Sequence, residues 1–260
     1  MPKTLRTSLT DRRLIAIGGE DRFDFLNNIL TQSVSQDMPV LVAAALLTPQ
    51  GKLLDEFLLY RRANDILLDC NTVRRESIRT RLQMYKLRSR VTLEDVAGAP
   101  VIFWGEQNEA QAHPDPRHGG LGWRSYEAVA PESSAEDWHH HRLSLGIAEG
   151  PDELVPGEQF PLEMGLHLTH AIDFQKGCFI GQEVTSRSFR RGSLRKGLFP
   201  CRIDGDLTTP AAIRSDNGQV GEVLCQRGAL GLALLRFDAL DKPLNADGQK
   251  ITVQSGLFTE

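Results

Sequence analysis

Segment 173–183 reads DFQKGCFIGQE and concentrates reactive side chains between two glycines. Cys178 carries a thiol, which reacts as its thiolate, and Lys176 carries a nearby cation that would favour this form. Gly177 and Gly181 permit backbone conformations and close approaches that a Cβ would hinder. The segment therefore predicts a shaped loop in which Cys178 and Lys176 are candidate catalytic residues. The alternative is that Cys178 is a small, inert core residue, as single cysteines often are.

The eight residues KGCFIGQE resemble the signature of the YgfZ-type proteins, K-G-C-[aromatic]-x-G-Q-E. These proteins are folate-binding relatives of the glycine-cleavage T-protein that support iron–sulfur enzymes. The resemblance implies that the whole signature loop is functional. Its residues are Lys176, Gly177, Cys178, Phe179, Gly181, Gln182 and Glu183. For Glu183 the alternative is a simple helical ion pair with Arg187, four residues later.

Weaker matches extend the resemblance over most of the chain. Residues 19–26 are similar to the family's opening G-x-D-x-x-x-FL block, and residues 47–55 to its L-x-x-x-G-[KR]-x-x-x-D block. Residues 115–117 and 121–124 resemble the DPR…GWR segment of the branch that includes mitochondrial iron–sulfur assembly factors. Residues 160–163 match the approach to the signature.

The resemblance implies an α+β protein with a T-protein-like ring of three subdomains and a C-terminal antiparallel β-barrel. Residues 1–48 and 137–194 would form the folate-binding α+β subdomain. Residues 49–136 would form a second, ferredoxin-like α+β subdomain, and residues 195–260 the barrel.

The resemblance also implies tetrahydrofolate, or a derivative, as the cofactor. Asp55 lies where T-proteins place an acid near the reactive folate nitrogens, and it could orient or protonate one of them. Glu56 could be the matching acid instead, which would leave Asp55 as a solvent-facing residue at the end of a strand. Glu163 could accept paired N–H donors from a pterin ring, or be an acid near a helix N-terminus. Asn71 is a further folate-binding candidate, unless it merely precedes a helix cap.

Three functions remain open. The leading hypothesis is a folate-binding protein that assists the assembly or repair of iron–sulfur enzymes, in which Lys176 lowers the pKa of the Cys178 thiol. The second is a folate-dependent one-carbon transferase that uses Asp55. The Tyr-Thr-Gly-Glu segment of T-proteins is absent from the sequence, which argues against aminomethyl transfer. The third is a non-enzymatic adaptor that docks RNA or an acidic protein, and the resemblance also implies a link with tRNA modification.

Composition and charge are those of an ordinary globular protein of 260 residues, 40% of them hydrophobic and 25% charged. The net charge of −4 argues against a general nucleic-acid-binding protein. Two stretches are nevertheless basic, residues 61–90 and residues 187–196. They are either solvated faces or an anion-attracting rim suited to a carboxylate tail, a phosphate or an RNA backbone.

The sequence favours a cytoplasmic protein without membrane contact, because it has neither an 18-residue apolar run nor the apolar stretch of a secretion signal. Early arginines could suggest an organelle transit peptide, but the strand-like run 14–17 follows closely. The four cysteines form no C-x-x-C pair, so reduced thiols are expected and no zinc or iron–sulfur site within the chain. Residues 139–141 are three histidines, but consecutive helical residues point about 100° apart and cannot all reach one ion. No metal is predicted.

Apolar patterns predict strands and helices on either side of the signature. Asp21 and Thr72 are expected to cap the first two helices. The expected strands are 13–17, 42–47, 53–60, 66–68, 91–93 and 101–104, the helices follow residues 21 and 72 and span 137–145, and residues 107–120 form a loop. Short strands at 197–203, 218–225, 229–236 and 250–253 indicate the small barrel.

Overall fold

A five-stranded antiparallel sheet forms the centre of the protein, in the order β3-β4-β5-β2-β6. The structure is a computed structural model that describes residues 5–105, 112–127, 129–192, 194–216 and 218–259. The sheet consists of β2 (Arg12–Gly18), β3 (Leu41–Leu47), β4 (Leu53–Arg61), β5 (Asp65–Asn71) and β6 (Thr92–Val96). The expected meander of β3, β4 and β5 is confirmed, because each strand pairs antiparallel with the next.

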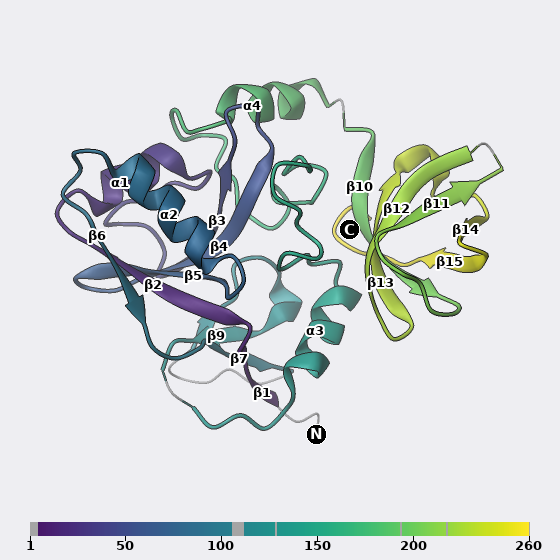
Figure 1. Cartoon of the computed structure of the whole chain (residues 1–260), viewed down its shortest axis with the longest axis horizontal. Coiled ribbons are helices and arrows are strands. Elements are labelled where there is room, and N and C mark those ends of the chain that lie inside the picture. The colour runs from purple at the N-terminus through teal and green to yellow at the C-terminus, as the bar shows by residue number, and fades with distance from the viewer. Residues whose placement is uncertain (1–4, 106–111, 128, 193, 217, 260) are drawn as a thin grey trace.

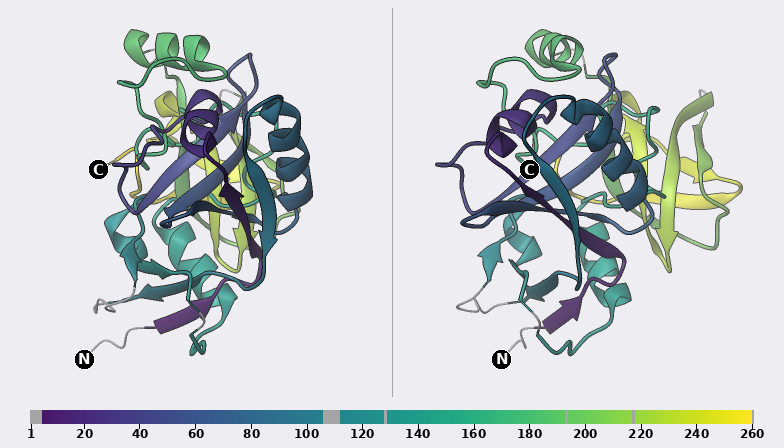
Figure 2. Two further views of the ribbon diagram at one scale, coloured as in Figure 1. Left: turned by 90° about the vertical axis from the view of Figure 1, so that its left-hand side faces the viewer. Right: turned by 60° about the vertical axis from the view of Figure 1, so that its left-hand side comes forward.

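Both faces of this sheet are buried at β3, β4 and β5. Every residue of β3 is buried, and successive side chains point to opposite faces, as strand geometry requires. One face packs against α1 (Arg22–Ile29) and α2 (Arg75–Lys86). The other face packs against the barrel and the segment that leads to it. The sheet therefore separates the two helices from the barrel, as Figures 1 and 2 show.

A smaller sheet lies beside the first, in the order β1-β7-β9-β8. Its strands are β1 (Leu5–Ser8), β7 (Val101–Trp104), β8 (His113–Pro114) and β9 (Trp123–Ser125), with a short 3-10 helix at Gly119–Leu121. Next to it, α3 (Ala135–Ser144) begins with a capping box in which Ser134 and Asp137 satisfy each other's backbone N–H groups. The expected loop 107–120 thus contains β8 and the start of the 3-10 helix, and its residues 107–111 lie outside the described residues.

The C-terminal residues form a closed, six-stranded antiparallel barrel, which confirms the expected architecture. Before it, α4 (Gln182–Arg191) lies at the top of the molecule in Figure 1. The barrel strands are β10 (Lys196–Ile203), β11 (Ala211–Ser215), β12 (Gly218–Arg227), β13 (Leu230–Arg236), β14 (Leu244–Ala246) and β15 (Gln249–Val253), with a 3-10 helix at Phe237–Ala239. The sequence pattern missed β11 and β14 because they are short and only partly buried.

Asp21 occupies the N-cap position of α1, as expected, but its side chain does not cap the helix, and the expectation that Thr72 caps α2 is wrong. The carboxylate of Asp21 accepts hydrogen bonds from the backbone and side chain of Arg90 and makes no bond to its own helix. Arg74, and not Thr72, precedes α2, and the Thr72 hydroxyl is buried without a partner among the described residues. In both cases a tertiary contact decides the outcome, which local sequence cannot reveal.

The expected subdomain boundary after residue 48 cuts through the central sheet. In the structure β3 pairs with β4 along its whole length, and β4 continues into β5 and β2. Strands β2 to β6 therefore belong together, because dividing them would expose a row of unpaired backbone groups. The C-terminal barrel begins at Lys196, one residue after the expected position.

A network of buried ion pairs joins the two sheets. Arg124 on β9 donates to Asp69 on β5 at 2.7 Å and to Asp115 at 3.3 Å. Arg117 makes a bidentate contact with Asp115, and Arg12 on β2 pairs with Asp69. The five side chains are at most 4% exposed. The arginines and the aspartate of the segment that resembles DPR…GWR therefore hold the two sheets together.

Candidate functional site

Cys178 is the one exposed cysteine among the four, all of which the structure describes. Burial raises the pKa of Cys70 and of Cys201 to about 12, and it raises the pKa of Cys225 as well. These three thiols stay protonated and inaccessible at neutral pH. The prediction that Cys178 is an inert core residue is wrong, and its thiol is available to solvent or to a partner.

Lys176 does not point at the thiol. Its ammonium donates hydrogen bonds to the backbone carbonyls of Asn27, Leu30 and Gln32, at 2.6, 2.8 and 2.9 Å. Asn27 lies in the last turn of α1 and Leu30 directly follows it, so Lys176 satisfies carbonyls that a helix end leaves without partners. Among the described residues no hydrogen bond joins Lys176 to Cys178. Burial lowers the pKa of Lys176 to about 8. The side chain thus anchors the loop to α1.

Two glycines bring the signature loop against the turn between β3 and β4. Gly181 has φ +81°, and a Cβ there would lie 2.6 Å from the carbonyl oxygen of Thr48. Gly51, in the turn itself, has φ +76°, and a Cβ there would lie 3.0 Å from the side chain of Val184. Phe179 is buried on the barrel side of the sheet. The loop is therefore fixed on both sides of Cys178, and the expectation of a shaped loop is confirmed for Gly181.

Helix α4 follows the loop directly and is basic on its outer face. Gln182 is its first residue, and the carboxylate of Glu183 pairs with Arg187 at 2.6 Å. Both of these side chains are more than half exposed. The structure therefore agrees with the alternative interpretation of Glu183, a helical ion pair with Arg187. Further along, the ring of Phe189 stacks on that of Phe174, with 3.9 Å between their centroids.

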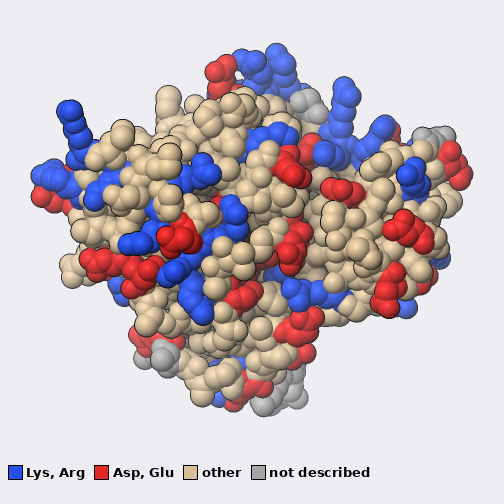
Figure 3. Space-filling model, in the orientation of Figure 1, with Lys and Arg blue, Asp and Glu red and all other residues tan. Residues whose placement is uncertain are grey.

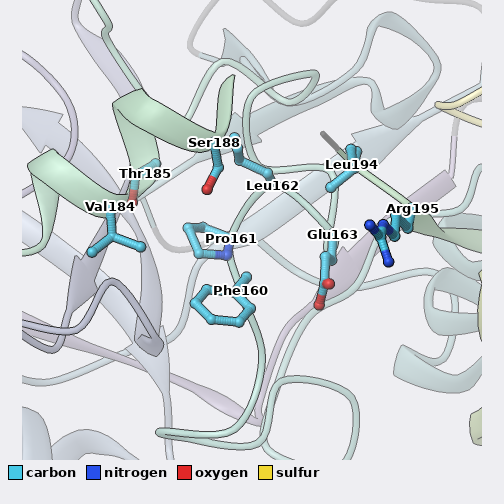
Figure 4. Close-up of a pocket in the computed structure, with 9 residues that line it drawn as sticks. All are labelled: Phe160, Pro161, Leu162, Glu163, Val184, Thr185, Ser188, Leu194 and Arg195. Atoms are coloured by element: carbon cyan, nitrogen blue, oxygen red, sulfur yellow. The ribbon is translucent and has the colours of Figure 1, made fainter. Parts of the chain in front are cut away.

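A cavity lies below α4, between the segment around Pro161 and the start of the barrel (Figure 4). The volume of the cavity that is accessible to water is about 230 Å³. Its total empty volume, including the open mouth, is about 660 Å³. Figure 4 shows Glu163 and Arg195 at one end and Val184 at the other, with Phe160 and Pro161 between them. The lining residues are Phe160, Pro161, Leu162, Glu163, Val184, Thr185, Ser188, Leu194 and Arg195.

The chemistry of this cavity fits a flat, polar ring system with an anionic tail. The Glu163 carboxylate can accept N–H donors, although Lys196 contacts it at 3.2 Å in this structure. Phe160 offers an aromatic face to the cavity, and the ammonium of Lys52 lies 3.8 Å from the centre of that ring. Arg195 supplies a cation at the mouth. Ligand cavities typically measure about 300–1,000 Å³, and the two volumes of this cavity, about 230 Å³ without and 660 Å³ with its open mouth, lie on either side of the lower end of that range.

Asp55 and Asn71 lie together, but elsewhere. Both line a second, much smaller cavity of about 10 Å³, enough for a single water molecule. The guanidinium of Arg74 holds the Asp55 carboxylate through two hydrogen bonds of 2.9 and 3.1 Å. Burial raises the pKa of Asp55, although Arg74 opposes the shift. Asn71 accepts a hydrogen bond from the backbone N–H of Val73, as expected for a residue before a helix. Neither residue lines the larger cavity with Glu163.

The sequence missed several residues that line the larger cavity. Thr185 and Ser188 belong to α4, and only the fold brings this helix over Phe160. Arg195 was noticed as part of a basic run, and its place beside Glu163 depends on how the barrel packs. No group of three or more His, Cys, Asp or Glu side chains that could hold a metal ion occurs in the described ranges.

Comparison with known proteins identifies the family. Residues 195–255 match the family model of the CAF17 C-terminal beta-barrel domain, which corresponds to the barrel described above. The iron–sulfur cluster assembly factor IBA57, mitochondrial, of Mus musculus is 31% identical over 91% of this chain and 79% of its own length. The chain belongs to the IBA57 family. The human IBA57 is 29% identical over the same shares, and a homologue from Pyricularia oryzae is 26% identical over 93% of this chain and 69% of its own.

A solved structure confirms the expected T-protein-like fold. The glycine cleavage system aminomethyltransferase T from Bartonella henselae superposes with a TM-score of 0.73, over 97% of this chain and 85% of that protein. Its sequence identity is 15%, so the likeness concerns the fold alone.

Two expectations are corrected by the IBA57 relatives. The resemblance to YgfZ correctly predicts the T-protein-like fold and a family of iron–sulfur assembly factors. The relatives, however, are named IBA57 and not YgfZ, in agreement with the branch that the DPR…GWR segment indicates. The expected cytoplasmic location is wrong, because these relatives are named mitochondrial. A missing apolar stretch argues only against secretion, since import into organelles uses basic, amphipathic segments. None of the described helices is long and apolar enough to cross a membrane.

Proposed function

We propose that this IBA57-family member assists the assembly or repair of iron–sulfur enzymes, and that Cys178 contacts the partner protein. The observation that carries the proposal is the exposed Cys178 thiol on a loop that is anchored at Lys176 and Gly181. The names of the relatives, iron–sulfur cluster assembly factors, support it.

A partner-facing thiol is favoured over a thiol that acts on a ligand in the cavity. Cys178 is exposed and is not among the residues that line the larger cavity. Clusters in proteins are commonly held by four cysteine thiolates, and the other three cysteines of this chain are buried. One exposed thiol can therefore supply one ligand at most, and the remaining ligands would come from a partner.

We also propose that the larger cavity binds tetrahydrofolate or a derivative. When bound, such a ligand supplies one-carbon chemistry or acts as a structural cofactor. Glu163 would accept its paired N–H donors and exchange Lys196 for them, Phe160 would stack against the ring, and Arg195 would meet the glutamate tail. The fold of this chain is similar to that of a glycine cleavage system aminomethyltransferase, and this similarity is compatible with the assignment.

The test of the thiol is complementation in cells that lack the native protein. Cys178→Ala is expected to abolish the recovery of iron–sulfur enzyme activities. The matched control is Gln175→Ala in the same loop, which removes an exposed side chain and should restore these activities fully. Equal melting temperatures of the two variants establish that folding is unaffected. Normal recovery with Cys178→Ala would show that the thiol has no part in the function.

The test of the ligand is calorimetric titration with tetrahydrofolate. Calorimetry is preferable to tryptophan fluorescence because none of the three tryptophans lines the larger cavity. Glu163→Gln should weaken binding about tenfold or more, since hydrogen bonds to a charged group contribute roughly 1.5–3 kcal/mol. Glu183→Gln makes the same chemical change on an exposed side chain outside the lining of this cavity and should bind normally. Absence of binding by the unaltered protein would refute the folate assignment while leaving the thiol proposal intact.

The other two functions have weaker support. A transferase that uses Asp55 would need this carboxylate free and next to a ligand, whereas Arg74 holds it beside a cavity of about 10 Å³. An RNA contact and a link with tRNA modification remain predictions from the basic segments and the resemblance alone.

A further inference from the structure

Helix α4 carries a group of exposed arginines directly after the Cys178 loop. Arg187, Arg190 and Arg191 lie on one side of the helix, because residues three and four positions apart are neighbours on a helix surface. The acid of this helix, Glu183, pairs with Arg187, whereas Arg190 and Arg191 make no ion pair within the described part of the chain. Figure 3 shows Lys and Arg gathered at the top of the molecule, where Figure 1 places α4. We call the three arginines the α4 patch.

The Cys178 loop runs along this helix. Phe174 stacks on Phe189 near the C-terminal end of α4, and the loop returns to the start of the helix at Gly181. Cys178 is four residues from Phe174 and three from Gly181, so its Cα lies within about 14 Å of either. A stable interface covers about 800 Å² on each partner, which is a surface about 30 Å across. One interface can therefore include both Cys178 and the α4 patch.

Phe189 adds exposed apolar surface between the loop and the arginines. One face of its ring stacks on Phe174 and the ring also meets His167, yet the residue is 46% exposed. Arg190 follows it in the sequence, about 100° further round the helix. Aromatic residues and arginine are enriched among the residues that contribute most to protein–protein binding. The combination is therefore typical of a protein-binding surface.

The α4 patch is separate from the larger cavity. Val184, Thr185 and Ser188 of the same helix line that cavity, and the three arginines do not. The arginines instead line an open groove along the helix, together with Gln182, Glu183 and Ser186. A change of charge in the α4 patch therefore leaves the lining of the cavity unaltered.

We propose that the α4 patch docks an acidic surface of the protein partner that contacts Cys178. This inference rests on the proposed role of Cys178 and adds the charge of the partner. Guanidinium groups bind carboxylates through paired hydrogen bonds, and Arg190 and Arg191 are unpaired in the described part of the chain. RNA fits less well, because the net charge of −4 lacks the broad basic excess of nucleic-acid-binding proteins. A second copy of this chain fits less well too, since two such patches would bring like charges together.

The test uses the Cys178 thiol to detect docking. Two peptides of equal length each carry one cysteine as a 2-pyridyl disulfide, which aspartate and glutamate surround in one peptide and asparagine and glutamine in the other. The Cys178 thiolate attacks the peptide sulfur, forms a mixed disulfide and releases pyridine-2-thione, which is followed by its absorbance. The other three cysteines are buried and do not interfere.

The ratio of the two rates, acidic peptide over neutral peptide, is divided by the same ratio for mercaptoethanol, a neutral free thiol. We expect this corrected ratio to be at least about ten at low salt and to fall as salt is added, because salt screens attraction between exposed charges. Any change in the thiol itself affects both peptides equally and cancels in the ratio.

Two matched variants assign the effect to the α4 patch. Arg190→Gln with Arg191→Gln should bring the corrected ratio close to one. Arg214→Gln with Lys250→Gln, the same loss of charge on exposed barrel residues, should leave it unchanged. The proposal is overturned if both variants act alike. It is also overturned if the Arg190 and Arg191 variant lowers the melting temperature and keeps the ratio, because these arginines then only stabilise the helix end.

Further outcomes separate this inference from the alternatives and from the proposed function. Tighter binding of a labelled uridine-rich RNA than of the acidic peptide to the α4 patch would overturn the proposal, as would dimerisation of the chain through it. The exchange assay needs no iron–sulfur enzyme, so it is independent of complementation. Lost complementation by Cys178→Ala, with a ratio that does not depend on the arginines, would overturn the acidic surface and leave the proposed function standing.

Discussion

Replacing Lys176 by methionine distinguishes the two roles that this side chain can have beside Cys178. If the ammonium lowered the pKa of the thiol, its removal would slow the reaction of Cys178 at neutral pH and leave the fold unchanged. The structure shows an anchor instead, with three hydrogen bonds to backbone carbonyls at the end of α1. We therefore expect Lys176→Met to destabilise the protein and free the loop.

The size of the effect follows from these contacts. Hydrogen bonds to a charged group contribute roughly 1.5–3 kcal/mol each, so three would contribute about 4.5 kcal/mol or more if fully buried. The desolvation that lowers the pKa of Lys176 to about 8 opposes this contribution at pH 7, and water can replace the ammonium at some of the carbonyls. We expect a loss of about 2–3 kcal/mol in the free energy of unfolding, measured by urea denaturation at pH 7. Lys176→Arg, which keeps the charge and the donors, should lose less.

The pH dependence provides a second measurement. Burial lowers the pKa of Lys176 to about 8 in the folded protein, below its usual value of 10.5. Between these two values the unfolded chain binds more protons than the folded one, so this group makes stability rise with pH. Lys176→Met should remove that rise.

The reaction of Cys178 with iodoacetamide, followed from pH 6 to 10, decides between the roles. An anchor leaves the midpoint of the thiol titration unchanged in Lys176→Met and increases the rate plateau, because the loop is looser. An upward shift of that midpoint with full stability would refute the anchor and restore the expectation from the sequence.

Further predictions concern the thiols, the ion-pair network and the cavity. A thiol reagent should modify one cysteine in the native protein and none in Cys178→Ser, and modification of a second native thiol would contradict the burial of the others. Arg124→Met should cost about 3–5 kcal/mol of unfolding free energy, because it leaves Asp69 buried with one partner fewer; Arg236→Met, in an exposed ion pair, should change stability little, and equal losses would count against the network. Lys196→Met should free the Glu163 carboxylate and strengthen tetrahydrofolate binding, whereas weaker binding would place Lys196 among the ligand contacts.

Regular patterns in the sequence predict much of the fold. The apolar runs that become β3, β4 and β7, and the evenly spaced short strands of the barrel, depend on local alternation and on turns between them. The sequence does not predict strands β1, β8 and β9, because they are two to four residues long and are stabilised by pairing with β7 or with each other.

The site is less predictable because tertiary packing assembles it. Sequence identifies Cys178 and Glu163 as chemically notable, but it places Lys176 next to the thiol, whereas the side chain reaches back to α1. Charged residues such as Arg124 are expected on the surface, yet this one is fully buried, since its partners come from strands far away in the sequence.

The glycine contact between the signature loop and the β3–β4 turn has a thermodynamic consequence. Gly51 and Gly181 bring the two segments into direct contact, and the same turn carries Lys52, whose ammonium lies against the ring of Phe160 in the cavity. A partner that shifts the Cys178 loop would therefore also shift the cavity. Linkage then requires that a cavity ligand changes the partner's affinity by the same factor by which the partner changes the ligand's. Replacing either glycine by alanine should bring this factor close to one while the two sites remain chemically complete.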